Sequence, residues 1–467
     1  MSRSQAMTDL VERAKPAVFW TDRSDKPSGA PCLEGPQRSD LVIVGGGFTG
    51  LWAALQALED NPGRMVRVLE AQVTGFGASS RNGGFCDPSL THGLGNGHSH
   101  WPDDMNTLLR LGDENLAGIL ASIERYSIDA AAWSTADVSM ATEPWQLDEL
   151  AEAVEIYRHY DQPFRLLDQT QAQMVANSPS YLGGLVNEGV VLVDPARLCW
   201  GLRRAVESLG GVVHDHSRVV DVESGASELR VLTDAGSVAA ERVILATNAW
   251  AEPDRQIRRY VLPIYDHVLM TEPLSMEQLA AIGWNGREGL ADSASQFHYY
   301  RLTEDQRILW GGYDANYHFG NGMGPKYEYQ TRSHALIAGH FFDTFPQLEG
   351  LGFSHRWAGP IGTTSKFAAA FGTRHDDRLA WVAGYTGLGV GASRFGARVA
   401  LDLVDGTPTE RTELEMVRKK PMPIPPEPLR SAVVALTRRA IVKSDANQGK
   451  RGPLLRTLDR FGVGFDS

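Results

Sequence analysis

The feature that most constrains the fold is a glycine-rich turn placed between an apolar strand and a helix. Residues 41–44 form a short apolar run, which is typical of a buried parallel strand. The sequence Gly45-Gly46-Gly47-Phe48-Thr49-Gly50 follows and opens a helical pattern, and residues 66–70 then form a second strand. This order predicts a βαβ unit that binds a dinucleotide.

Each position of the motif has a physical role. Gly45 permits the tight turn, Gly47 lets the backbone approach a pyrophosphate at the helix start, and Gly50 lets the helix pack on the sheet. Glu70 ends the second strand, where an acid binds ribose hydroxyls and repels a 2′-phosphate, so the ligand is FAD or NAD rather than NADP. The predicted cofactor contacts of this unit are Gly45, Gly47, Phe48, Thr49, Gly50, Glu70 and Ala71.

Two further segments favour FAD over NAD. Residues 75–84 are rich in small side chains and include Ser, Arg and Asn, which suits a loop lying against a flat ring. Residues 381–390 again run from a strand through a glycine turn into a helix, whose start would stabilise negative charge on a reduced ring. The predicted contacts from these segments are Gly77, Ala78, Ser79, Ser80, Arg81, Asn82, Gly83, Gly84, Gly387, Leu388, Gly389 and Val390.

Composition excludes several other classes. The net charge of -12 argues against a nucleic-acid partner. No apolar run approaches the ~18 residues of a transmembrane helix, and the polar start is no secretory signal, so we expect a cytoplasmic protein without a transmembrane segment. The three scattered cysteines predict neither a disulfide framework nor a metal site.

In this order, the motifs resemble the D-amino-acid oxidase (glycine/sarcosine oxidase) family of flavoproteins, and within it the γ-glutamylputrescine oxidase-like group. The resemblance covers residues 41–406 and extends to Asp-Pro-Ala-Arg at 194–197, Ala-Thr-Asn-Ala-Trp at 246–250, Met-Thr-Glu-Pro-Leu at 270–274 and Ile-Leu-Trp-Gly-Gly at 308–312. It implies further cofactor contacts at Val219, Thr247, Asn248, Trp250 and Gly359.

The resemblance also implies a mixed α/β fold in which a Rossmann-like FAD-binding domain is interleaved with an antiparallel-sheet substrate domain. The FAD-binding domain would comprise residues 40–100, 188–262 and 352–406, and the substrate domain residues 101–187 and 263–351. Residues 1–39, broken by prolines, would form an irregular arm. Residues 407–467 would form a helical tail, which is basic because residues 411–467 contain twelve Lys or Arg and six Asp or Glu. We favour a helix packed on the acidic body over a membrane or partner contact.

Two departures from the family pattern concern the cofactor. Leu388 stands where relatives often have a histidine in the late glycine turn. No cysteine lies near residues 359–367, where sarcosine oxidases have a flavin-linking cysteine, and Arg81 and Asn82 stand at the alternative histidine linkage site. We therefore expect FAD to be bound non-covalently.

By resemblance, a small amine or amino-acid-like substrate would transfer a hydride to flavin N5, and water would hydrolyse the resulting imine. Oxygen would then be reduced to hydrogen peroxide. Lys366 is a candidate for oxygen activation or substrate anchoring, with a solvated lysine as the alternative. The other candidate catalytic residues are His298 and Tyr300. The candidate substrate-binding residues are Tyr265, His267, Arg301 and Trp357. The alternative for each aromatic residue in this set is a position in the hydrophobic core without substrate contact. The alternative for Arg301 is a structural ion pair.

Three alternatives remain at this stage. A flavin dehydrogenase would pass electrons to a quinone or carrier protein, with the basic tail docked at a membrane. An aromatic-ring hydroxylase shares the first βαβ unit but normally has Gly-Asp in the late turn, which is absent here. A non-catalytic flavin-binding protein would act as a partner or assembly factor.

Overall fold

The computed structural model describes residues 2–251, 254–460 and 462–463. The strands in this part of the chain form two β-sheets. The first sheet has eight strands, and its centre is parallel, as the βαβ pattern predicts. Its main strands in spatial order are β18 (Ala370–Arg374), β19 (Leu379–Ala383), β11 (Gly236–Leu245), β2 (Gly35–Val44), β3 (Val66–Leu69) and β8 (Val212–His214). The antiparallel strands β9 (Val219–Ser224) and β10 (Leu229–Thr233) extend it from β11.

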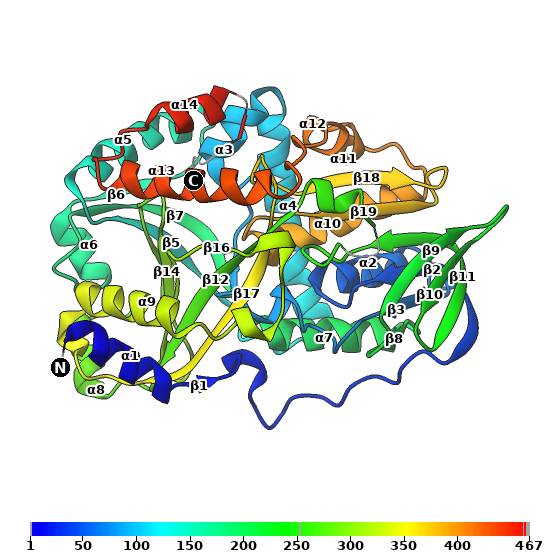
Figure 1. Ribbon diagram of the computed structural model, residues 1–467, viewed down its shortest axis with the longest axis horizontal. Helices are drawn as coiled ribbons and strands as arrows, with labels where there is room; N and C mark the ends of the chain where they lie inside the picture. Colours follow the sequence, from blue (N-terminus) through cyan, green and yellow to red (C-terminus); the bar gives the residue numbers. More distant parts are fainter. Residues whose placement is uncertain (1, 252–253, 461, 464–467) are drawn as a thin grey trace.

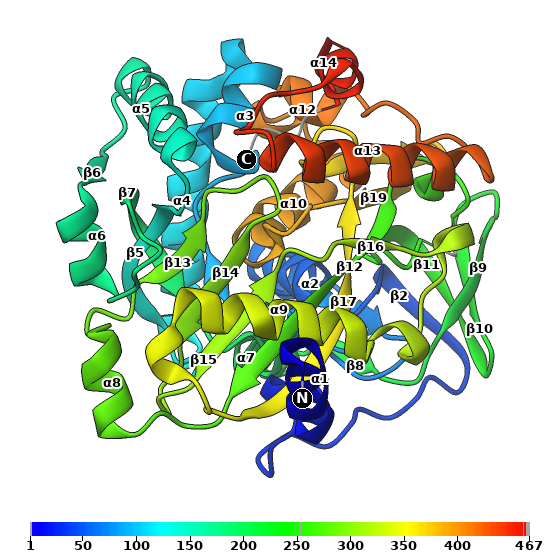
Figure 2. The same ribbon diagram turned by 60° about the vertical axis from the view of Figure 1, so that its left-hand side comes forward.

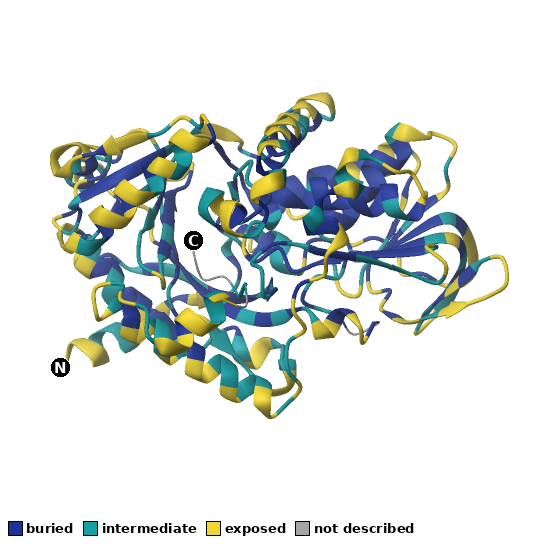
Figure 3. Cartoon of the chain, turned by 90° about the horizontal axis from the view of Figure 1, so that it is seen from above, coloured by how far each residue is buried: buried dark blue, intermediate teal, exposed yellow. Residues whose placement is uncertain are grey.

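The parallel sheet is covered by helices because its central strands are apolar on both sides. Leu41, Val42 and Ile43 of β2 are completely buried. Helix α2 (Phe48–Asp60) follows the glycine motif and packs against α7 (Pro195–Ser208) and α10 (Gly389–Val404). Figure 1 shows these helices beside the sheet, and Figure 3 shows buried residues concentrated in the strands and the helices next to them. This buried unit holds the start of α2 in a fixed position.

The second sheet has eleven strands and is largely antiparallel. Its path runs through β1 (Lys15–Pro16), β17 (Phe353–Thr363), β12 (Leu262–Thr271), β15 (Ile308–Gly312), β14 (His298–Leu302), β13 (Gly289–Asp292), β5 (Trp133–Ala141), β7 (Gly183–Leu192) and β4 (Phe85–Cys86). Off this path, β16 (Asn316–Tyr317) pairs with β12, and β6 (Arg165–Leu167) pairs with β7.

The remaining helices are divided between the two sheets. Helix α9 (Thr331–Thr344) packs on β12 and β15 and against the N-terminal helix α1 (Arg3–Arg13). The other helices are α3 (Gly93–His100), α4 (Met105–Arg125), α5 (Pro144–His159), α6 (Gln169–Val175), α8 (Met276–Ile282), α11 (Glu410–Glu413), α12 (Glu415–Arg418), α13 (Leu429–Asp445) and α14 (Pro453–Arg460). Of these, α4 and α11 pack on α10 and α12 packs on β18 of the first sheet, whereas others pack on the second sheet. Figures 1 and 2 both show α13 crossing above the strands of the two sheets.

The structure differs from the expected segments in two ways. The N-terminal arm is not irregular throughout, because Ser2 caps α1 and Val11 of that helix is buried against the core. Strands β4 and β17, expected in the FAD-binding domain, pair within the eleven-stranded sheet, as does the end of β7. Local apolar patterns locate a strand but do not specify its partner, which explains why the pairing of β4, β7 and β17 differs from the expected segments.

In the part of the chain that the structure describes, no helix is both long enough and apolar enough to span a bilayer.

Candidate active site

A cavity of about 1240 Å³ lies where the two sheets meet. Its walls come from the ends of β2 and β3, the start of α2, the 76–95 segment, β12, β17 and the turn before α10. Pockets for small molecules measure roughly 300–1,000 Å³, so this cavity has room for an extended ligand and a second small molecule.

At one end of the cavity, the glycine motif leaves no space for side chains. A Cβ atom at Gly45, where φ is 111°, would lie 2.6 Å from the carbonyl oxygen of Ala246. A Cβ at Gly50 would lie 1.9 Å from the Gly45 carbonyl oxygen, so strand end and helix start are in direct backbone contact. Gly47 has no side chain to cap α2, and the Phe48 amide donates to Ser79 Oγ at 2.9 Å, so the next amides of the first turn are the ones available to an anion.

Glu70 lies at the same end, as predicted. Its Oε2 accepts a hydrogen bond from the Gly46 amide at 2.7 Å, and its Oε1 accepts one from the Gln72 amide at 2.9 Å. Burial raises the pKa of Glu70, while these backbone bonds oppose the rise. A close backbone approach, available amides at the helix start and a fixed carboxylate together fit the adenosine diphosphate half of a dinucleotide.

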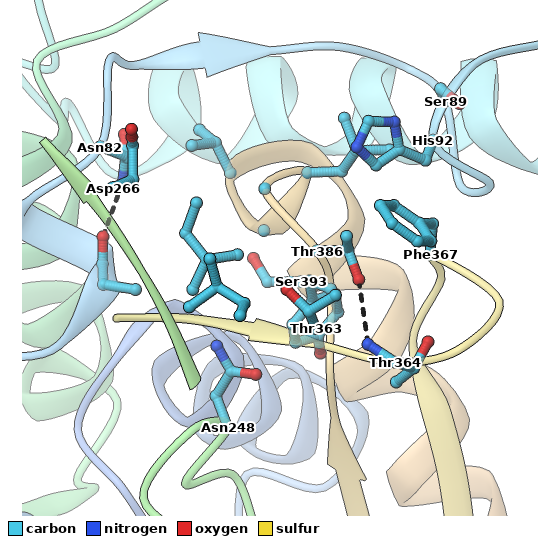
Figure 4. Close-up of a pocket in the computed structure, with 18 of the residues that line it drawn as sticks. Asn82, Ser89, His92, Asn248, Asp266, Thr363, Thr364, Phe367, Thr386 and Ser393 are labelled. Carbon is cyan, nitrogen blue, oxygen red and sulfur yellow. Dashed lines mark hydrogen bonds between the residues drawn. The ribbon is translucent and has the colours of Figure 1, made fainter. Parts of the chain in front are cut away.

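The other end of the cavity is lined by loops suited to a flat ring. Asn248, which has a φ of 45°, accepts a hydrogen bond from the Gly384 amide at 2.8 Å and so joins the loop after β11 to the turn between β19 and α10. Asn82 fixes the 76–84 loop, because its amide group donates to the Ala78 carbonyl and accepts from the Gly84 amide. Figure 4 shows Asn82 beside Asp266 at one side of this region, and His92 beside Phe367 at the other.

The structure brings nearly all of the predicted cofactor residues together at this cavity. The lining residues among them are Gly45, Gly47, Phe48, Thr49, Glu70, Ala71, Gly77, Ala78, Ser79, Arg81, Asn82, Gly83, Gly84, Val219, Thr247, Asn248, Trp250, Gly359, Gly387, Leu388, Gly389 and Val390. Gly50 and Ser80 lie behind the lining: Gly50 packs against Gly45, and Ser80 is buried beside Gly75.

Arg81 lines the cavity but already has an anionic partner. Its guanidinium donates to Glu328 Oε2 at 2.6 Å, and the two side chains are only 7% and 8% exposed. It also donates to the carbonyl oxygens of Phe76 at 3.0 Å and Ala358 at 3.2 Å. This buried pair joins the 76–84 loop to the eleven-stranded sheet, so its first role is structural.

The candidate substrate residues of β12 lie on the opposite side of the strand from the cavity. Ile264 and Asp266 line the cavity, whereas Tyr265 and His267 point into the core beneath α9. The Tyr265 hydroxyl accepts a hydrogen bond from the Gly324 amide, and the His267 ring meets His334 at 5.2 Å. Side chains of a strand alternate between its two faces. The sequence located this strand correctly but did not show which of its faces lines the cavity.

The same inversion occurs on β14. Tyr299 lines the cavity, whereas His298 and Tyr300 lie on the far side of the sheet. His298 Nδ1 is 2.6 Å from Asp292 Oδ2, and the Tyr300 hydroxyl is 2.7 Å from that of Tyr181. These contacts belong to the protein core rather than to the substrate chamber.

Three further candidates are also absent from the described lining of the cavity. Arg301 is buried and donates to the carbonyl oxygens of Gly83 and Val193, so it supports the loop behind the site. Trp357 is fully buried and donates to the Arg81 carbonyl. Lys366 is half-buried, and its ammonium lies 5.2 Å from the centre of the Trp101 ring.

Asp266 and Tyr299, which were not among the candidates, form a polar pair on the cavity wall. The Tyr299 hydroxyl donates to Asp266 Oδ2 at 2.5 Å. Burial raises the pKa of Asp266 to about 6, although the bond from Tyr299 lowers it. A carboxyl group with this pKa exchanges a proton readily near neutral pH. The signal that could have found them is strand alternation, because a strand with Tyr265 or Tyr300 on one face has Asp266 or Tyr299 on the other.

A second group of acids lines the cavity away from the glycine motif. Asp87 follows β4, and Asp137 lies on β5. Asp87 accepts hydrogen bonds from the Ser89 amide at 2.5 Å and from Asn187 Nδ2 at 3.3 Å. Burial, reinforced by the charge of Asp87, raises the pKa of Asp137 to about 7. No sequence motif singled these residues out.

The C-terminal tail completes the cavity. Val433, Val434, Thr437, Arg438 and Ile441 of α13 line it. Arg438 forms an ion pair with Asp314 and donates to Asn316 Oδ1 at 2.9 Å. The favoured prediction of a packed tail is consistent with this arrangement, and the structure adds that the packed face borders the cavity.

Among the described residues, no group of three or more His, Cys, Asp and Glu side chains is arranged to hold a metal ion.

The two sheets, the glycine motif and the fixed Glu70 define a dinucleotide-binding oxidoreductase. Residues 40–403 match the family described as FAD dependent oxidoreductase, so the chain belongs to this family and the expected D-amino-acid oxidase membership is confirmed. The protein is therefore an FAD-dependent oxidoreductase.

Individual relatives agree with this assignment. The chain is 31% identical over 373 residues to the gamma-glutamylputrescine oxidoreductase of Escherichia coli, covering 79% of this chain and 84% of the relative. It is 29% identical over 396 residues to the probable oxidoreductase OrdL of Haemophilus influenzae, covering 83% and 88%. Glycine oxidase from Geobacillus kaustophilus has the same fold, with a TM-score of 0.67, 20% identity, and coverage of 82% of this chain and 99% of that structure.

Proposed function

We propose that the protein binds FAD non-covalently and oxidises a small amine or amino-acid-like substrate, with oxygen as the electron acceptor. The observation that supports this proposal best is the position of the Asp266–Tyr299 pair on the wall of the same cavity as the FAD-binding loops. The names of two relatives, gamma-glutamylputrescine oxidoreductase and glycine oxidase, denote amine and amino-acid chemistry and agree with it.

FAD, when bound, supplies a two-electron acceptor that takes a hydride at N5. The protein must hold the substrate's α-carbon toward the ring and leave its amine uncharged before the C–H bond breaks. We assign the second task to Asp266, whose carboxylate can accept the ammonium proton while Tyr299 holds it in place. Loss of the ammonium proton to Asp266 and of a hydride from the α-carbon leaves an iminium ion, which water hydrolyses to a carbonyl compound and an ammonium ion.

The chamber favours a positively charged substrate over a negatively charged one. Arg301 does not reach the cavity, so the expected anchor for a substrate carboxylate is not provided by this residue. Among the described residues, three arginines line the cavity. Arg81 and Arg438 are paired with Glu328 and Asp314, and Arg218 precedes Val219, a predicted FAD contact. Within the proposed substrate class, an amine without a carboxylate therefore has stronger support than an amino acid.

The non-covalent attachment of FAD is supported by the absence of cysteine from the described lining residues. His92 does line the cavity, and burial lowers its pKa. Precipitation of the holoprotein with acid tests this part of the proposal directly. Yellow flavin should remain in the supernatant, and a yellow pellet would contradict it.

The test of the reaction is anaerobic mixing of the purified yellow protein with a panel of primary and N-methyl amines and amino acids. A decrease in the visible absorbance of the oxidised flavin after addition of any amine would support the proposal. Admission of air should then restore this absorbance and produce one equivalent of hydrogen peroxide. If a quinone but not oxygen restored the absorbance of the oxidised flavin, the protein would be a dehydrogenase rather than an oxidase. If no compound reduced the flavin, the non-catalytic alternative would be favoured.

A further inference from the structure

The Asp87 and Asp137 carboxyl groups lie in the ligand cavity but have no cationic partner. Both residues line the cavity, and in the described residues neither forms an ion pair with Lys, Arg or His. Oδ1 of Asp137 is inaccessible to solvent and has no hydrogen-bond partner. A cation in the cavity would offset the cost of this incompletely bonded, partly buried carboxylate through its charge, while Oδ1 itself stays shielded beside Gly289.

The environment of the pair has the character of a binding subsite. Asn187 and the Ser89 amide fix the Asp87 carboxylate by donating to its two oxygens. Asp137 lies opposite Asn187 in the pairing of β5 with β7, and the Asn187 side chain donates to Asp87, so the two carboxyl groups are neighbours. Tyr157 also lines the cavity. Burial raises the pKa of Asp137 to about 7, and the negative charge of Asp87 adds to the rise.

A continuous row of side chains connects this pair to the proposed reaction site. Tyr299, which is bonded to Asp266, meets the Phe85 ring edge-on at 5.9 Å. A Cβ atom placed on Gly289 would lie 2.4 Å from Phe85 and 3.2 Å from Asp137 Oδ1, so Phe85 and Asp137 are neighbours. Phe85 itself lines the cavity. The two acidic positions are thus separated by one aromatic ring, against which an alkyl chain can pack.

We propose that Asp87 and Asp137 bind a second ammonium group of the substrate, so that the preferred substrates are diamines with an alkyl spacer. The inference rests on the proposed amine oxidation, in which the reacting amine lies at Asp266. Two carboxylates at the far position would neutralise the distal cation, and Phe85 would contact the methylene groups between the two nitrogens.

The first experiment compares 1,4-diaminobutane with butylamine in anaerobic flavin reduction at pH 8, where Asp137 is ionised. We expect an apparent Kd at least tenfold lower for the diamine. In Asp137→Asn and in Asp87→Asn, the preference for diamine over monoamine should fall at least tenfold. Asp148→Asn, an exposed acid on α5 away from the cavity, is the matched control and should keep the wild-type preference.

The second experiment measures binding without turnover, by calorimetric titration of 1,4-diaminobutane into the fully reduced holoenzyme. Heat of binding that is present in wild type and lost in both variants would support the subsite. If at the same time no amine reduced the flavin, only the proposed function would be overturned. Equal affinity for both amines, or a preference unchanged in both variants, would overturn the subsite while leaving amine oxidation intact. The flavin spectrum and melting temperature of each variant verify that it is folded.

Discussion

The Tyr299 hydroxyl donates a 2.5 Å hydrogen bond to Oδ2 of Asp266, and both side chains face the cavity that receives FAD. The two residues lie on β14 and β12, strands that are separated in the sheet by β15. Their contact therefore depends on the sheet as a whole and orients the one carboxyl group that we assign to proton transfer.

The pH dependence of amine oxidation should follow Asp266. Burial raises its pKa to about 6, so the proton-accepting carboxylate becomes populated as the pH increases from 5 to 7. We expect kcat/KM to rise across this interval, and Asp266→Asn to lower it by about 10²–10⁴-fold and remove the rise. Tyr299→Phe removes a bond that lowers the pKa, so the rise should move to higher pH. An unchanged profile in Asp266→Asn would assign the proton to another group.

Gly50 should tolerate no side chain, because a Cβ there would lie 1.9 Å from the Gly45 carbonyl oxygen. We expect Gly50→Ala to separate α2 from β2, to destabilise the protein by about 1–3 kcal/mol as overpacking does, and to reduce FAD retention. Gly339→Ala on α9 is the matched control, because nothing lies within 4 Å of the new methyl group. That change should be neutral or stabilise by up to about 1 kcal/mol. Thermal unfolding and the ratio of flavin to protein absorbance measure both effects, and equal behaviour of the two variants would refute the packing argument.

Glu328 should be essential for the loop that lines the cavity beside the flavin. Glu328→Gln leaves the guanidinium of Arg81 buried without a counter-charge, which typically costs about 3–5 kcal/mol. The exposed pair Arg3–Asp343 offers a control, because Asp343→Asn should change stability by less than about 1 kcal/mol. Chemical denaturation of the holoprotein compares the two variants. If Glu328→Gln lowered the free energy of unfolding no more than Asp343→Asn does, the Arg81 guanidinium would be solvated.

Arg438 should hold α13 over the cavity. Arg438→Ala removes the ion pair to Asp314 and the bond to Asn316, and we expect faster cleavage of the C-terminal segment in limited proteolysis. Quenching of flavin fluorescence by iodide should also increase. Arg439→Ala changes an exposed neighbour on the same helix and should leave both rates as in wild type. Identical quenching in the two variants would mean that α13 does not limit solvent access.

Local sequence was sufficient for the cofactor half of the site. The glycines at 45, 47 and 50 and Glu70 follow the strand at 41–44 at fixed spacing, and that spacing indicates their roles without knowledge of the rest of the fold. For the same reason, the predicted contacts of the 77–84 and 387–390 turns all line the cavity except Ser80.

The substrate half depended on packing between distant segments. Alternation along β12 and β14 separates two faces, but both faces are buried, one against the cavity and one beneath α9, so apolar pattern does not distinguish them. The meeting of Asp87 with Asp137, and the position of α13 over the cavity, join segments that lie tens to hundreds of residues apart in the chain. Such contacts are selected by the shape of the assembled sheets rather than by neighbouring residues, and for this reason they appeared only in the folded molecule.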